Sequence, residues 1–418
     1  MSQTTHPILE DYTDKNFDPY VTFDRMSGAE DVTDIWPRLH ELERNGAVQK
    51  GDARVAFGVP PFPFWTHLPS YMLFGYDNVS KAFFDGATFS STIMMSIYTG
   101  TFGASINGMD APEHMRYRRL FQRAFLPGTV AKWGAELVPK VVDRLIDRFI
   151  HKGNAELVQD FTIHYPFDIV YEQLALPVND LEVFKKLTVG LMCVGIDPEH
   201  AMEGSRKLGV YLEALLKARG EAGTDDLIGM LARAQVEGEK LPTEIAVSFL
   251  RQLMNASGDT TYRSTSSFFV GLLSNPAQFA AVKADRSLIP QAIEEALRWE
   301  GPLTIAVRQT TCDVEIDGVL IPKGAKVDLM QASANHDATQ FENPERFDIF
   351  RPRKRNLAFA YGAHICIGQH LARIEMERAI NMLLDRLPNL RLDPDYPPPS
   401  IIGVNSRAPK EVRVVFDA

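Results

Sequence analysis

The sequence predicts a mainly α-helical protein with a smaller β part. Between about residues 112 and 300, apolar residues recur at three- and four-residue spacing, which is typical of amphipathic helices. Residues 307–327 and 401–416 instead resemble short strands separated by turn residues. Proline and glycine are spread along the chain, with no long linker and no internal repeat. We therefore expect a single domain over residues 1–418.

The composition is that of a soluble globular protein, with 45% hydrophobic and 23% charged residues in 418. A net charge of −10 excludes the overall basic field of a nucleic-acid-binding protein. The chain shows no signal-peptide pattern at its start and no stretch near the ~20 apolar residues of a membrane span. Three cysteines (Cys193, Cys312 and Cys366) are too few and too scattered for a disulfide framework and suit a reducing compartment. We expect a cytoplasmic monomer without a membrane anchor.

Three segments illustrate the expected order of elements. Phe62–Leu68 and Tyr71–Phe74 alternate in polarity around a Pro-Ser pair, which predicts a β-hairpin. Val138–Phe149 has the apolar spacing of an amphipathic helix. Pro242–Ser274 has no internal proline, so it predicts a helix of about 50 Å that crosses the domain.

The most informative segment is residues 356–375 (NLAFAYGAHICIGQHLARIE). Cys366 stands just before a helical pattern, where free backbone N–H groups lower a thiol pKa and favour the thiolate. The flanking glycines allow the backbone to approach a flat partner closely. The alternative for a cysteine taken by itself is a buried free thiol.

This segment resembles the cysteine loop of the cytochrome P450 family, whose pattern is Phe-Gly-x-Gly-x-His-x-Cys-x-Gly. The matching residues are Phe359, Gly362, His364, Cys366 and Gly368. Ala360 departs from the pattern, which usually has glycine there, so we expect a slightly altered loop. The resemblance implies that haem b is bound with Cys366 as the axial thiolate and with Phe359 near its sulfur. Zinc on His364, Cys366 and His370 is the competing metal, but the paired Cys-x-x-Cys modules common in zinc sites are absent.

The long predicted helix contains the small and polar residues 256–261 (ASGDTT). Such a run is costly in a helix, and by itself it indicates a kink or a hydrated face. It resembles the family's Ala-Gly-x-Asp/Glu-Thr-Thr segment, with Ser257 in place of glycine. The resemblance implies that Asp259 is the acid and Thr260 the alcohol of a proton relay for O2 activation.

Two further motifs follow in the family's order. Glu295 and Arg298 share a helix face, although this spacing alone is weak because it recurs elsewhere in the chain. Residues 343–347 (NPERF) resemble the family's Pro-Glu-Arg-Phe segment. The resemblance implies that Arg346 completes a buried Glu–Arg–Arg network that locks the cysteine loop.

Haem propionates require cationic or hydrogen-bonding partners. Residues 112–118 (PEHMRYR) resemble the family's Pro-x-His-x-x-x-Arg helix, which assigns His114 and Arg118 to the propionates. Arg308 and His364 occupy the other matching positions. The alternative for each cation is a surface charge.

The substrate pocket is expected to be apolar and adaptable in shape, because its candidates lie in regions that resemble the family's variable substrate regions. The candidates are Met94, Met95, Phe102, Met192, Asn255, Ala256, Ile305, Val307 and Val404, with Asn405 as a further hydrogen-bonding residue. A hydrophobic small molecule is the expected substrate.

The resemblance covers the whole chain and implies the family's mostly α fold, with haem between the long helix and the cysteine-loop helix. It implies a monooxygenase that uses O2 and two electrons, with a ferredoxin as the expected donor. Basic residues at Arg116, Arg119, Arg123 and 353–355 are candidates for the docking face, or else a generic solvated surface. A peroxide-driven peroxygenase and a non-catalytic haem-thiolate sensor are the alternatives, and the Asp259–Thr260 pair argues against both.

Overall fold

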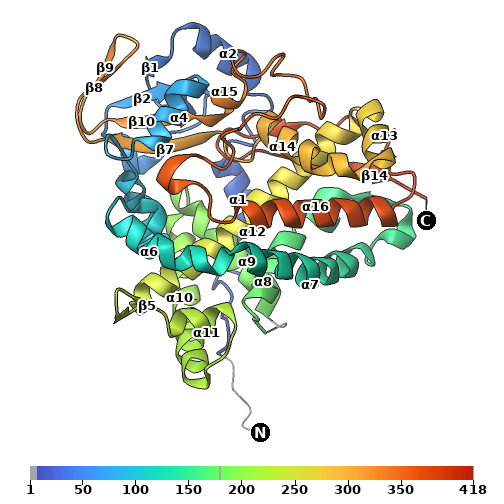
Figure 1. Cartoon of the computed structure of the whole chain (residues 1–418), viewed down its shortest axis with the longest axis horizontal. Helices are drawn as coiled ribbons and strands as arrows, with labels where there is room; N and C mark the ends of the chain where they lie inside the picture. Colours follow the sequence, from blue (N-terminus) through green and yellow to red (C-terminus); the bar gives the residue numbers. More distant parts are fainter. Residues whose placement is uncertain (1–6, 178–179, 418) are drawn as a thin grey trace.

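A computed structural model describes residues 7–177 and 180–417 of the chain. Helices dominate it (Figure 1). The α-helices are α1 (Pro19–Met26), α2 (Trp36–Arg44), α3 (Ala53–Ala56), α4 (Tyr76–Phe84), α5 (Met95–Thr101), α6 (Glu113–Gln122), α7 (Pro127–Ile146), α8 (Tyr165–Gln173), α9 (Leu181–Gly190), α10 (Pro198–Ala222), α11 (Leu227–Ala232), α12 (Thr243–Leu273), α13 (Pro276–Ala284), α14 (Ile289–Trp299), α15 (Gln331–Asn335) and α16 (Gln369–Arg386). The prediction of a mainly helical protein with a smaller β part is confirmed.

The largest sheet has five strands in the order β1-β2-β10-β7-β3. Only β2 and β10 pair in parallel, and the other neighbours are antiparallel. Its strands are β1 (Val48–Lys50), β2 (Ser70–Leu73), β3 (Phe89–Ser90), β7 (Ile305–Thr310) and β10 (Lys326–Met330). A three-stranded sheet and three two-stranded ribbons complete the β part. They are β11 (Arg391–Leu392) with β14 (Arg413–Val415) and β4 (Asn154–Glu156); β12 (Ile401–Ile402) with β13 (Ala408–Pro409); β5 (Gln235–Val236) with β6 (Glu239–Lys240); and β8 (Val314–Ile316) with β9 (Val319–Ile321). Strands β1, β2, β7 and β10 gather at the upper left of Figure 1, whereas β5 and β14 lie elsewhere.

The predicted hairpin between Phe62–Leu68 and Tyr71–Phe74 is wrong. Residues 63–65 form a 3-10 turn, and β2 pairs instead with β1 and β10. Three prolines in residues 60–63 (PPFP) remove the backbone donors that a ladder strand needs. The alternation in polarity was therefore not a strand signal there.

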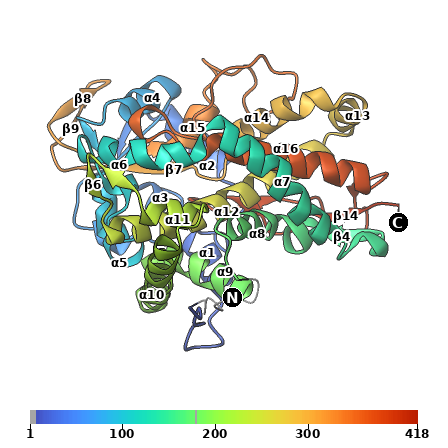
Figure 2. The same cartoon turned by 60° about the horizontal axis from the view of Figure 1, so that its bottom comes forward.

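Helix α12 runs without interruption from Thr243 to Leu273, so its small polar stretch does not break it. It crosses the centre of the molecule behind α16, which lies beside α7 (Figures 1 and 2). Most of its side chains are buried, because it packs against α8, α10, α14 and α16. Its central position brings residues 253–264 to the inside of the molecule.

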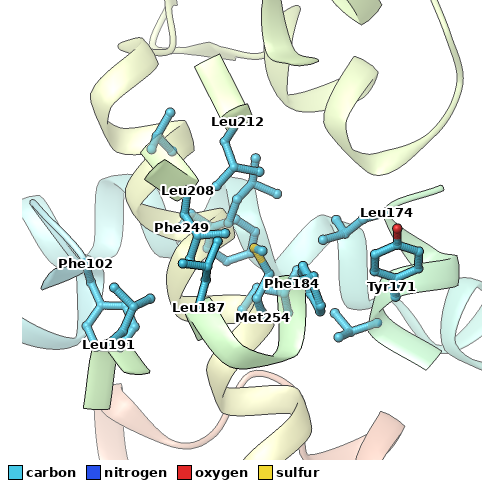
Figure 3. Packing of buried hydrophobic residues seen from close by; sticks show 14 of the residues in the cluster. Phe102, Tyr171, Leu174, Phe184, Leu187, Leu191, Leu208, Leu212, Phe249 and Met254 are labelled. Atoms are coloured by element: carbon cyan, nitrogen blue, oxygen red, sulfur yellow. The ribbon is translucent and has the colours of Figure 1, made fainter. Parts of the chain in front are cut away.

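A hydrophobic cluster on one side of α12 joins this helix to α6, α9 and α10. Phe249 and Met254 of α12 pack among Leu187 of α9, Leu191 and Leu208 (Figure 3). The Phe249 ring also stacks on Phe121 of α6, with 3.8 Å between centroids. Among the described residues, no helix has both the length and the apolar character needed to cross a membrane.

Candidate functional site

A cavity of about 450 Å³ lies between α12, the cysteine loop and the segment before β7. Cys366, His364 and Phe359 line it from the loop, and Thr260 and Ser257 line it from α12. Most of the remaining lining is apolar. Residues from widely separated parts of the sequence therefore form one site, as the resemblance implied.

The cysteine loop is shaped by a tight turn just before α16. The Cys366 amide donates to the Phe359 carbonyl at 3.0 Å, and the Ala360 amide donates to the carbonyl of Leu357 at 2.9 Å. Ala360 itself takes the left-handed conformation, with φ of +58°, which is strained for any residue with a Cβ. The loop keeps its turn, and the replacement of glycine puts the strain on Ala360.

Gly362 explains why the loop needs glycine at a second place. Its φ is +70°, and a Cβ there would lie 2.6 Å from the Phe83 carbonyl oxygen of α4. The loop therefore approaches α4 closely, and only glycine meets both requirements.

Burial raises the pKa of the Cys366 thiol. The backbone N–H groups of Gly368 and Gln369 and the charges of Arg118 and Arg373 oppose this rise. The N–H groups at the helix start therefore act in the predicted direction, but in the protein chain by itself desolvation of the anion outweighs them.

Four basic side chains predicted to bind propionates lie together beside the cavity. Arg118 and Arg308 line it with His364, and the His114 ring stacks on His364 with 4.0 Å between centroids. The Arg118 guanidinium donates to the Ile365 carbonyl, which ties α6 to the cysteine loop. Within the described chain, no carboxylate pairs with Arg118 or Arg308, and His114 Nε2 is buried without a partner.

The electrostatics of this group favour an anionic ligand. Burial lowers the pKa of His114 to about 4 and that of His364 to about 3, and nearby arginine charge adds to both shifts. Burial also lowers the pKa of Arg118 and Arg308. Buried cations are costly unless they are paired, so this end of the cavity fits a ligand that carries carboxylates.

The two members of the predicted proton relay face different ways. Thr260 lines the cavity, and its hydroxyl donates to the Ala256 carbonyl at 2.8 Å. The buried Asp259 carboxylate instead accepts from Arg263 Nε at 2.9 Å, and Arg263 also reaches Asp24 of α1 at 3.4 Å. Burial raises the pKa of Asp259 despite the charge of Arg263.

Packing explains why residue 258, next to Ser257, is a glycine. A Cβ on Gly258 would lie 2.2 Å from the Phe167 ring of α8, so the glycine permits close contact between α8 and α12. Ser257, the neighbouring residue, lines the cavity.

The structural network predicted around Glu295 is present with one change of residue. Arg298 pairs with Glu295 at 2.8 Å, and the third member is Arg351, at 3.2 Å. The prediction for Arg346 is wrong, since its side chain is exposed and only its carbonyl accepts, from Arg298 and Arg351. The chain turns after residue 346, and this turn brings Arg351 to the carboxylate.

Six of the nine predicted substrate-pocket residues line the cavity: Met94, Phe102, Met192, Ala256, Ile305 and Val307. The other three do not. Met95 packs on Gly108, Asn255 donates to the Thr188 carbonyl at 3.4 Å, and Val404 belongs to a separate hydrophobic cluster.

Sequence reasoning missed a buried carboxyl in the cavity wall. Glu375 of α16 lines the cavity, and burial raises its pKa well above the ordinary value. Its only sequence signal was an acidic residue on the apolar face of the helix that follows Cys366. The zinc alternative finds no support, because the described residues contain no group of three or more His, Cys, Asp or Glu that could hold a metal ion.

Comparisons with known proteins agree with this site. The family model described as Cytochrome P450 matches residues 213–403. The putative cytochrome P450 YjiB of Bacillus subtilis is 31% identical over 77% of this chain and 82% of its own length. The vitamin D3 dihydroxylase of Streptomyces griseolus is 35% identical over 68% of this chain and 70% of its own length.

The fold is similar to solved structures of the same family. The structure of CYP108D1 from Novosphingobium aromaticivorans has a TM-score of 0.81 at 28% identity and covers 95% of this chain and 98% of its own. CYP109E1 from Bacillus megaterium, solved in complex with testosterone, has a TM-score of 0.81 at 25% identity and covers 92% and 100%. The chain therefore belongs to the cytochrome P450 family and is a haem-binding monooxygenase of the bacterial type.

Proposed function

We propose that this enzyme hydroxylates a hydrophobic small molecule, using O2 and two electrons that a ferredoxin supplies. The observation that carries the proposal is that one largely apolar cavity contains both Cys366 and the hydroxyl-bearing face of α12. Three free cysteines also suit the reducing cytoplasm. We propose that the enzyme works there as a monomer.

The residues beside the cavity fit haem. Cys366 would hold the iron through its sulfur. Arg118 and Arg308 would pair with the two propionates, and His114 and His364 would donate hydrogen bonds to them. Bound haem would supply the iron at which O2 is activated. The Phe359 carbonyl accepts the hydrogen bond from the Cys366 amide, and the Arg373 guanidinium lies 4.3 Å from the Phe359 ring centre.

Protons reach the cavity through the chain's own side chains in this proposal. Thr260 holds a proton at Oγ1, at the cavity surface. Arg263 keeps its charge and pairs with both Asp259 and the half-exposed Asp24, so it holds the Asp259 carboxylate in place next to Thr260 in the chain rather than passing a proton itself. The raised pKa of Asp259 favours transient protonation.

A peroxide-driven reaction is the second candidate, because the Asp259 carboxylate is tied to Arg263 and is not itself in the cavity lining. Such a reaction needs no proton relay from the solvent. Oxygen dependence of product formation separates it from the first candidate.

The experiment combines spectroscopy with turnover. The reduced holoenzyme with carbon monoxide is expected to show the strongly red-shifted Soret band of a thiolate-ligated haem, and Cys366→Ser is expected to lose it. With ferredoxin, its reductase and O2, Thr260→Ala is expected to consume electrons with much less product than the wild type, and Ser264→Ala, also in the cavity wall, serves as the matched control.

Product formed only with peroxide would favour the second candidate. Rapid reduction without any product from a broad panel of apolar compounds would contradict both and favour a sensor. Full coupling in Thr260→Ala would remove Thr260 from the relay.

A further inference from the structure

Asn405 lies on the loop between β12 and β13 and is one of the side-chain amides that line the cavity, with Asn107, Gln252 and Gln331. The buried Arg407 holds this loop from behind. Its guanidinium donates to the Gly403 carbonyl at 2.6 Å and the Ile401 carbonyl at 3.1 Å, and it pairs with Glu300 at 3.0 Å. The loop therefore has a defined shape.

Backbone hydrogen bonds fix the position of the same loop against its neighbours. The Gly403 amide donates to Val32 and the Val404 amide to Ser27, each at 2.8 Å. The Thr304 amide donates to the carbonyl of Asn405 at 3.3 Å. The backbone that carries the Asn405 side chain is thus preorganised before any ligand binds.

Arg54 of α3 determines which way the Asn405 amide points. One guanidinium nitrogen donates to Asn405 Oδ1 at 2.6 Å, and Arg54 Nε donates to the Pro60 carbonyl at 2.7 Å. The guanidinium also lies 4.2 Å from the ring centre of Phe62. Since arginine only donates, the amide oxygen of Asn405 faces Arg54 and the NH2 group faces away from it.

The charge of Arg54 strengthens this arrangement. Arg54 is 5% exposed, and no carboxylate pairs with it in the part of the chain that the structure describes. Burial lowers the pKa of Arg54 to about 10, so it stays charged at neutral pH. A buried cation polarises the amide bound to it, which makes Nδ2 a better donor.

The NH2 group of Asn405 has no acceptor among the described residues, unlike that of Asn255, the other amide predicted for the pocket. The Asn255 NH2 group already donates to the Thr188 carbonyl. No described residue accepts from Asn405 Nδ2, although its side chain borders the cavity.

We propose that Asn405, oriented by Arg54, is a specificity-determining residue that donates a hydrogen bond from Nδ2 to a carbonyl oxygen on an otherwise apolar substrate. This inference rests on the proposed hydroxylation of a hydrophobic molecule in the same cavity. Asn405 recognises the substrate, and Arg54 is a positioning residue that acts through it.

The test uses a panel of cyclic ketones of ten to fifteen carbons, each paired with its parent hydrocarbon. Dissociation constants come from the spin-state shift of the ferric holoenzyme. The wild type is expected to bind the ketones about tenfold more tightly than the hydrocarbons, the discrimination of one well-placed hydrogen bond. Asn405→Asp keeps the partner of Arg54 but has no donor, so its preference is expected to fall below about twofold.

Arg54→Met tests the positioning role, because it leaves Asn405 in place but frees its amide to rotate. Its preference for ketones is expected to fall by several-fold. Asn255→Ala is the matched control, and its ratio of ketone to hydrocarbon affinity is expected to equal that of the wild type.

An unchanged ratio in Asn405→Asp overturns the inference, and an unchanged ratio in Arg54→Met overturns the positioning role. Equal binding of ketone and hydrocarbon by the wild type overturns the inference but leaves the proposed function standing. A normal carbon monoxide band without a shift for any compound of either series contradicts the hydrophobic substrate and, with it, the assignment of Asn405.

Discussion

Arg351 shows how a single residue can hold the segment that precedes the cysteine loop without belonging to a motif that the sequence analysis singled out. Its guanidinium pairs with the buried Glu295 and donates to the carbonyls of Asn343 and Arg346. Glu295 thus has two arginine partners, Arg298 and Arg351. Removing Arg351 leaves the buried Glu295 with one arginine partner in place of two, so its charge is less well compensated.

We therefore expect Arg351→Ala to lower the free energy of unfolding by about 3 kcal/mol, as is typical when a buried ion pair is broken. Arg346→Ala is the matched control, because the Arg346 side chain is exposed and only its carbonyl takes part. Its effect is expected to stay within about 0.5 kcal/mol. Urea denaturation of both holoenzymes measures the difference, and equal losses would contradict the assignment.

The ion pair between Arg351 and Glu295 also shows what sequence reasoning could not predict about single residues. Cys366, His364 and Phe359 were predictable because their spacing lies within one loop. Arg351 was not predictable, since its contact with Glu295 depends on the turn of the chain after residue 346. Glu375 was missed for a similar reason: burial against a cavity leaves no local pattern.

His336 gives a pH dependence at the same scale. Its Nε2–H donates to the Trp299 carbonyl at 2.8 Å, and its ring stacks on Trp36 with 3.7 Å between centroids. Burial, together with the charge of Arg298, lowers its pKa well below the ordinary 6.5. Below pH 6.5 the unfolded chain therefore binds a proton that the folded protein refuses, and stability falls as the pH falls.

Between pH 6 and 5, His336→Gln is expected to reduce this fall in the free energy of unfolding by up to about 1.4 kcal/mol per pH unit, the value for one proton. Urea unfolding at several pH values measures the slope. The control is His370→Gln, which replaces an exposed histidine. Its free energy of unfolding is expected to change with pH as that of the wild type does. Parallel slopes for His336→Gln and the wild type would mean that His336 is protonated in the folded state.

At the scale of elements, the segment before α1 binds across α9 and α10. Tyr12 is buried against Gly190 of α9 and Gly204 of α10, and a Cβ on Gly204 would lie 2.5 Å from the Tyr12 hydroxyl oxygen. Thr13 Oγ1 donates to Glu203 at 2.6 Å, and Phe17 stacks on His200 with 4.0 Å between centroids. Sequence patterns predicted the helices but not this contact, because it joins segments far apart in the chain.

Gly204→Ala is expected to lower the free energy of unfolding by about 1–3 kcal/mol through overpacking against Tyr12. Tyr12→Phe removes a hydroxyl that is buried without a partner among the described residues, so it is expected to be neutral or slightly stabilising. It should also recover part of the loss in the double variant, since the same Cβ lies 3.3 Å from Tyr12 Cζ. Additive effects in this double-mutant cycle would contradict the contact.

At the scale of the whole molecule, the ferredoxin proposed as electron donor would need a local basic face on this acidic protein. Helix α6 borders the cysteine loop through Arg118, and the exposed Arg119 and Arg123 lie at its end. Arg116 of the same helix pairs with Glu237 at 3.0 Å, so its charge is already compensated.

Reversing Arg119 and Arg123 to glutamate is expected to raise the KM for ferredoxin several-fold at low salt, with a smaller effect at high salt because charges are then screened. Arg116→Glu is the matched comparison, and its effect is expected to be smaller. Steady-state reduction at two salt concentrations measures both. An unchanged KM in the double variant would place the docking face elsewhere.

The hydrogen bonds from Gly403 and Val404 to Val32 and Ser27 join two segments more than 350 residues apart at the cavity wall. During synthesis the first of these segments leaves the ribosome long before the second is made. The wall at Asn405 can therefore close only after residues 403–405 have been made, even where the helices have already formed. Contacts between such distant segments form slowly, so the apolar cavity stays open in the nascent chain until then.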